Sequence, residues 1–121
     1  MNQQQERLMR YLTEQSAACL AKQQALAADE RRDEAAFEQI RANIFEVFRT
    51  VLTTAQNTCG DDAAIQTFFV QRLAQIPGAW TNALNEARAH HDTHQQHLQH
   101  VKLGVVQEIR REMARLEVEA P

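Results

Sequence analysis

The stretch FEQIRANIFEVFRTVLTTA, residues 37–55, decides how this chain folds. Its apolar side chains recur every three or four residues, which is the spacing that places them on one face of an α-helix. They are Phe37, Ile40, Ile44, Val47, Phe48, Val51 and Ala55. Phe45 and Leu52 fall outside this stripe and widen the apolar surface. The stretch therefore predicts a helix over residues 33–57 that lies at the centre of a core.

The rest of the chain points to the same class. Its 121 residues are rich in Ala, Gln, Leu, Glu and Arg, which are strong helix formers, and they include only 3 glycines and 2 prolines. Gly60, followed by two aspartates, and the pair Pro77-Gly78 are typical helix boundaries. We predict a single all-α domain over residues 1–121. It is a small antiparallel helical bundle of about four helices, over residues 3–28, 33–57, 62–76 and 79–118.

Two boundaries leave alternatives open. No glycine or proline separates the first two helices, so one continuous helix over residues 3–57 is the alternative there. The last predicted helix also lacks an internal proline, and at about 60 Å it would be longer than the others. A competing break lies at Asp92, because the run DTHQ, residues 92–95, has the pattern of a capping box. We expect residues 79–118 to form one long C-terminal helix.

An apolar seam with heptad-like spacing, typical of a coiled coil, follows this long helix. Past Val101 the helix extends beyond its neighbours, and an exposed apolar stripe is uncommon on a soluble monomer. We therefore expect a homodimer that buries the stripe. The expected interface residues are Leu98, Val101, Val105, Ile109, Met113 and Leu116.

All 5 histidines lie in the run HHDTHQQHLQH, residues 90–100. On a continuous helix His90, His94 and His97 fall within a wedge of about 60°, and Glu86 joins them one turn earlier. Side chains at this spacing can share a zinc or nickel ion, since imidazole is a common metal ligand. The alternative is a solvated polar helix face. No other cofactor is expected.

Two of the histidines, His91 and His94, occupy positions in the apolar seam. Burial in a dimer interface would disfavour their protonated form. Acid would then weaken the dimer, unless the rings lie at the wet edge of the seam.

The composition argues against several function classes. The net charge of −3 provides no general attraction to nucleic acid or to an anionic membrane. No run reaches the ~18 apolar residues of a membrane span, and residues 1–7 do not resemble a signal peptide. We expect a cytoplasmic protein in which Cys19 and Cys59 are reduced thiols. The chain also lacks a phosphate-binding loop and a nucleophile paired with a base.

We therefore predict a non-enzymatic helical interaction or adaptor protein that forms homo-oligomers through its C-terminal helix and meets an unidentified protein partner. The alternative is a metal-binding helical protein, a sensor or a store, that uses the histidine cluster at residues 90–100.

Overall fold

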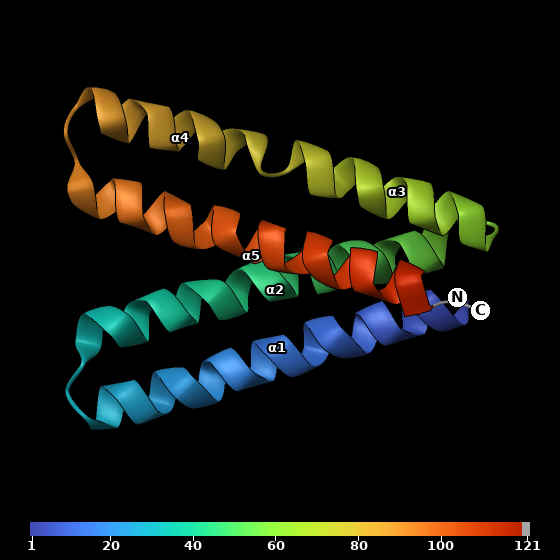
Figure 1. Ribbon diagram of the computed structural model, residues 1–121, viewed down its shortest axis with the longest axis horizontal. Helices are drawn as coiled ribbons and strands as arrows, with labels where there is room; N and C mark the ends of the chain where they lie inside the picture. The colour runs from blue at the N-terminus through green and yellow to red at the C-terminus, as the bar shows by residue number, and fades with distance from the viewer. Residues whose placement is uncertain (120–121) are drawn as a thin grey trace.

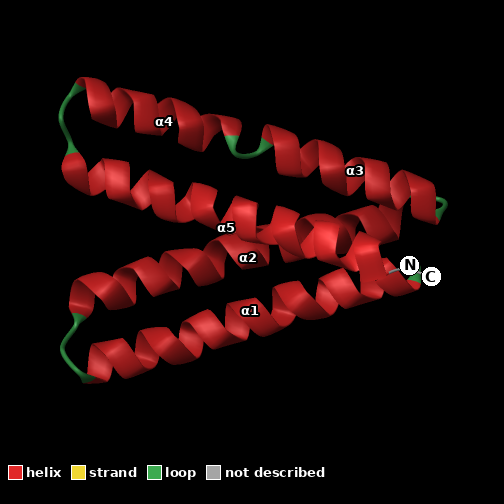
Figure 2. Cartoon of the chain, in the orientation of Figure 1, coloured by secondary structure: helices red, strands yellow, loops and turns green. Residues whose placement is uncertain are grey.

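The computed structural model describes residues 1–119, and all of the regular structure within them is helical. Figure 2 shows helices joined by short loops. The predicted all-α helical class is confirmed. The helices are α1 (Gln3–Ala28), α2 (Arg32–Thr58), α3 (Asp62–Gln75), α4 (Gly78–Ala89) and α5 (Thr93–Glu119). The first three lie within one residue of their predicted ends.

The helices form four rods, because α3 and α4 follow one another almost in line (Figure 1). Helices α1 and α2 make one hairpin, and α4 and α5 make another. The first turns of α1 and the last turns of α5 lie side by side at one end of the molecule. The side-chain amide of Gln4 donates a hydrogen bond to the carbonyl oxygen of Leu116 at 3.4 Å there.

The core is built around α2, as residues 37–55 predict, but the predicted stripe is rotated: Val47 is 38 % exposed, whereas Phe45 and Leu52, expected beside the stripe, are buried. Phe45 and Phe48 are completely buried, and the ring of Phe48 packs edge-on against Phe69 of α3 and Trp80 of α4, with 6.3 Å between ring centroids in each pair. Ile109 of α5 belongs to the same buried cluster. Helix α2 therefore joins its own hairpin to α3, α4 and α5.

The predicted helix over residues 79–118 is wrong, because the chain turns back at His90–Asp92. The N–H of Asp92 donates to the carbonyl oxygen of Ala87 at 2.8 Å, and the N–H of His91 donates to that of Arg88 at 3.2 Å. These two bonds form a Schellman motif, in which His91 adopts a left-handed conformation with φ 54°. The Asp92 carboxylate then caps α5 by accepting a hydrogen bond from the N–H of Gln95. The competing break at Asp92 is the one that the chain uses.

The turn between α1 and α2 has the same construction. The N–H of Arg31 donates to the carbonyl oxygen of Leu26 at 2.9 Å, and the N–H of Glu30 donates to that of Ala27 at 3.1 Å. Glu30 is left-handed, with φ 60°. A single helix over residues 3–57 therefore does not form.

Arg41 ties α5 to the first hairpin. Its Nη2 donates to both carboxylate oxygens of Glu108, at 2.7 and 2.9 Å, and its Nη1 donates to Glu38 at 3.1 Å. Lys22 of α1 lies 3.5 Å from the same Glu38 carboxylate. Burial lowers the pKa of Arg41, but the hydrogen bonds and charge of Glu108, with smaller contributions from Cys19 and Glu38, together raise it above its ordinary value. The network sets the position of α5 along α1 and α2.

Candidate functional site

The proposed metal ligands lie on two different helices. The Glu86 and His90 side chains approach each other at the end of α4, with 3.5 Å between Oε2 and Nε2. His94 and His97 start α5 instead and pack against the ring of Phe37, at centroid distances of 6.1 and 4.3 Å. The single-helix wedge assumed for these residues is therefore wrong. Residues 1–119 contain no group of three or more His, Cys, Asp or Glu that could hold a metal ion. Zinc or nickel binding stays a prediction.

The apolar stripe of the C-terminal helix is covered by the chain itself. Val105 and Ile109 are fully buried and Leu116 is 5 % exposed, whereas Leu98, Val101 and Met113 are half-buried. The turn at His91 is the physical reason, since it brings α5 back over α1 and α2 instead of letting the helix project. The expectation of an exposed stripe is wrong for Val105, Ile109 and Leu116, which the chain itself buries. A homodimer stays a prediction.

His91 and His94 are both exposed, so neither lies in a buried seam. His91 is part of the turn, and its backbone conformation excludes it from a helix. The continuous helical seam assumed for these two histidines is therefore wrong, and acid sensitivity of a dimer stays a prediction.

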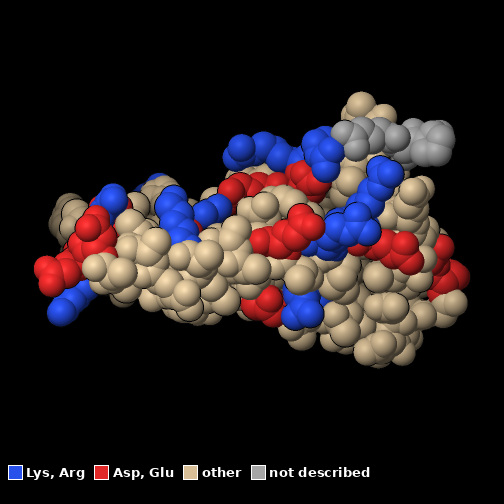
Figure 3. All heavy atoms as spheres, turned by 90° about the horizontal axis from the view of Figure 1, so that it is seen from below, with Lys and Arg blue, Asp and Glu red and all other residues tan. Residues whose placement is uncertain are grey.

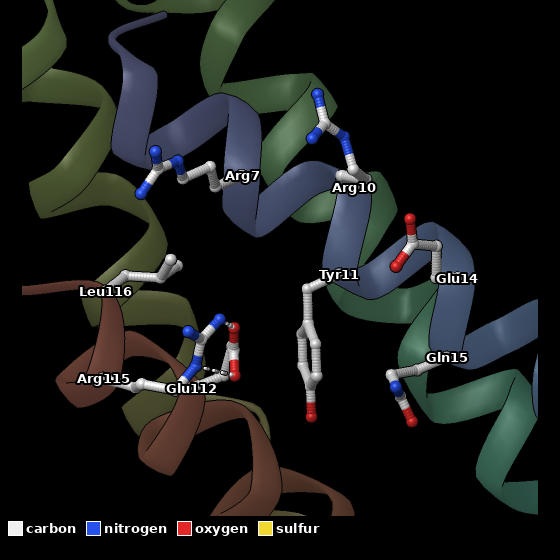
Figure 4. A pocket seen from close by; sticks show the side chains of 8 residues that line it. All are labelled: Arg7, Arg10, Tyr11, Glu14, Gln15, Glu112, Arg115 and Leu116. Carbon is white, nitrogen blue, oxygen red and sulfur yellow. Dashed lines mark hydrogen bonds and ion pairs between the residues drawn. The ribbon is translucent and has the colours of Figure 1, made fainter. Parts of the chain in front are cut away.

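A surface cavity of about 530 Å³ lies between α1 and α5, where the first turns of α1 lie beside the last turns of α5. Figure 4 shows Arg7 and Arg10 projecting from α1, the side chain of Tyr11 between the two helices, and an ion pair on α5. The residues that line the cavity are Arg7, Arg10, Tyr11, Glu14, Gln15, Glu112, Arg115 and Leu116. We call this feature the arginine cavity.

The sequence contains only weak signals for this site. Arg7, Arg10 and Glu14 recur at helical spacing on α1, which is equally typical of a solvated face. Arg115 belongs to a run of alternating charges on α5. The two segments are separated by 96 residues, 16–111, and only the bundle brings them together.

Tyr11 forms the floor of the arginine cavity and connects it to the core. Its ring packs edge-on against Phe45, at a centroid distance of 6.0 Å. Burial, with smaller contributions from the charges of Glu108 and Glu112, raises the pKa of Tyr11 to about 12. The phenol therefore keeps its proton to a higher pH than an exposed tyrosine does.

The arginine cavity has an excess of positive charge, since three arginines and two glutamates line it. Arg115 pairs with Glu112 on the same helix, with Nε donating to Oε2 at 3.0 Å. The lining therefore has an excess of one positive charge. Figure 3 shows Lys and Arg side chains spread along this face of the molecule, with acidic side chains between them.

Comparison with models of known protein families, with curated proteins and with solved structures finds no match. The function must therefore be argued from the chain's own residues. None of the helices in residues 1–119 has the length and apolar character needed to cross a membrane.

Proposed function

We propose that the chain is a non-enzymatic helical interaction protein that binds an acidic segment of a partner protein in the arginine cavity. The observation that carries this proposal is the gathering of three arginines around one cavity, in a chain whose net charge is −3. The planar guanidinium group matches a carboxylate and can bind it through two parallel hydrogen bonds. The Arg10 side chain has no ion-pair or hydrogen-bond partner within residues 1–119, so it is available for such a contact.

The mixed lining favours a peptide over a polyanion. Glu14 and Glu112 lie in the same cavity as the arginines and would repel the closely spaced phosphates of a nucleic acid. Tyr11 and Leu116 add apolar surface. A segment that combines acidic and apolar side chains satisfies both parts of the lining.

Binding without catalysis is supported by the state of the candidate nucleophiles. Burial raises the pKa of the Cys19 thiol to about 11, and Tyr11 is also protonated at neutral pH. Ser16 is buried within α1. A nucleophile normally requires an adjacent base or a lowered pKa, and these groups have the opposite environment.

We place this binding in the cytoplasm. Cys19 and Cys59 are both free, as is usual in a reducing compartment.

Titration of a fluorescently labelled peptide of about ten residues, mainly Glu with Leu, tests the proposal through its anisotropy at low salt. We expect a Kd of about 10–100 µM, which rises with ionic strength. Arg10→Glu should raise the Kd by at least about ten-fold, because it replaces attraction by repulsion inside the cavity.

Arg88→Glu is the matched control. Arg88 is an exposed residue of α4 that does not line the arginine cavity, and its substitution changes the net charge by the same amount. It should change the Kd by less than about two-fold at moderate salt. Equal effects of the two variants, or no binding by the wild-type protein, would contradict the proposal.

A further inference from the structure

An apolar groove between α3 and α5, on another side of α5 from the arginine cavity, is not used by the proposed function. Its volume is about 340 Å³. Leu73, which is 4 % exposed, and the half-buried Met113 form its base. Val70 of α3 lines it and is 45 % exposed, which is unusual for a large apolar side chain in residues 1–119. An apolar surface of this kind gains free energy when a partner covers it.

Charged side chains of opposite sign mark the two ends of this groove on α5. Arg110 and Glu117 are both exposed and line it, and Ala114 lies between them. They are seven residues apart, which is about two helical turns or ~10.5 Å. Neither side chain has an ion pair or hydrogen bond within residues 1–119. By contrast, Glu108 and Glu112 on the same helix are paired.

We propose that this groove is the contact surface of a symmetric dimer of the chain, in which two α5 helices pack antiparallel. The point midway between Arg110 and Glu117 lies between Met113 and Ala114. A two-fold axis through this point places Arg110 of one copy opposite Glu117 of the other, and the symmetry makes the same pair twice.

The side chains at the centre allow the helices to approach. Ala114 is small and exposed, so two α5 helices can pack at the short interaxial distances of about 8–10 Å found in bundles. Val70 and Met113 of each copy then lie within the covered surface. A second copy in antiparallel orientation places a glutamate opposite Arg110 and an arginine opposite Glu117 by symmetry. An unrelated partner would not carry this pair of charges at this spacing as a matter of course.

This dimer differs from the one that the apolar periodicity of α5 predicts. It leaves Val105, Ile109 and Leu116 in the core of their own chain. It also leaves the arginine cavity open, because that cavity lies between α5 and α1.

Light scattering coupled to size exclusion, from about 1 µM to about 500 µM protein, tests the proposal. We expect a monomer–dimer equilibrium with a Kd of about 10–100 µM that weakens at high salt. Arg110→Glu places two glutamates opposite each other at both contacts, and we expect the Kd to rise by at least about ten-fold. Glu117→Arg should have the same effect.

The double variant Arg110→Glu with Glu117→Arg exchanges the charges and should restore the Kd to within about three-fold of the wild type. Arg111→Glu is the matched control, because Arg111 is the neighbouring exposed arginine but does not line the groove. It should leave the Kd unchanged. All four substituted proteins should unfold at the same urea concentration as the wild type, since the changed side chains are exposed.

A monomer at every concentration would overturn the proposal. So would a double variant as weak as the single ones, or a loss of affinity in Arg111→Glu equal to that in Arg110→Glu. None of these results bears on the peptide assay, which measures a different cavity through Arg10.

Discussion

Tyr11 takes its properties from residues that are distant in the sequence. It packs against Phe45 of α2, and after burial itself the next contributions to its raised pKa come from Glu108 and Glu112 of α5. Its own sequence neighbours identify it only as a residue beside the apolar face of α1. At the residue scale, the packing of α1 against α2 and α5 is what half-buries this tyrosine and raises its pKa.

The stability of the fold should fall as the pH rises from about 10 towards 12, because of Tyr11. The folded protein has a pKa of about 12 for this phenol, against 10.0 for an exposed tyrosine, so it keeps a proton that the unfolded chain loses. The stabilisation is complete below pH 10 and is lost as the pH passes through the folded value. The loss is at most about 2.7 kcal/mol, and smaller because water reaches part of the ring.

Urea unfolding of the wild type and of Tyr11→Phe over this pH range measures the effect. The pKa of Cys19 is also raised, to about 11, so ionisation of this thiol lowers the stability of both proteins over the same pH range. The difference between their free energies of unfolding cancels the Cys19 contribution and leaves that of the Tyr11 phenol. A difference that stays constant with pH would mean that the phenol is not buried. As the only tyrosine, Tyr11 also reports its own ionisation by ultraviolet absorbance.

At the scale of elements, the two hairpin turns depend on left-handed residues that are not glycine. Glu30 and His91 each follow the last turn of a helix, with φ of 60° and 54°. A side chain in this conformation costs about 1–2 kcal/mol, which is why glycine usually occupies it. Both turns therefore carry this conformational strain. Neither turn has the glycine that usually marks the end of a helix in a sequence.

His91→Gly should stabilise the protein by about 0.5–1 kcal/mol, since relief of the left-handed strain outweighs the greater freedom of glycine in the unfolded chain. The free energy of unfolding in urea measures this change. His90→Gly is the control, because His90 has φ −99° and gains no relief. It should destabilise the protein by up to about 1 kcal/mol. A destabilised His91→Gly protein would indicate that the chain does not turn through a left-handed residue at this position.

Across the whole molecule, burial is distributed unevenly. Helix α2 buries eight residues, including Phe45 and Phe48, whereas α4 buries only Leu84 and Ala87. Helix α4 also lies at the edge of the arrangement and runs along α5 (Figure 1). The free energy that holds an element in place follows its buried apolar area, so α4 should be the first part to open.

Hydrogen exchange followed by mass spectrometry should show this order. We expect the backbone amides of Gly78–Ala89 to exchange at least about ten-fold faster than those in the middle of α2. The peptides to compare are those from Leu84 onward and those around Phe48, away from the fraying helix ends. Equal protection of the two helices would indicate that the bundle opens only as a unit.

The sequence by itself determined the all-α class, the bounds of α1, α2 and α3, and the role of residues 37–55 as the centre of the core. These features depend on periodicity, helix propensity and local caps, which act over a few residues. The break at Asp92 was also readable as a capping box, but nothing local decided between that cap and a continuous helix.

Only the tertiary structure decided which surfaces are covered. The turn at His91 splits the proposed metal ligands between α4 and α5, and it buries Val105 and Ile109, which a projecting helix would have exposed. The arginine cavity and the groove at Val70 exist only where segments distant in the chain meet. The physical reason is that burial depends on which faces come together. That is a property of the whole packed chain, and the periodicity of a single helix does not contain it.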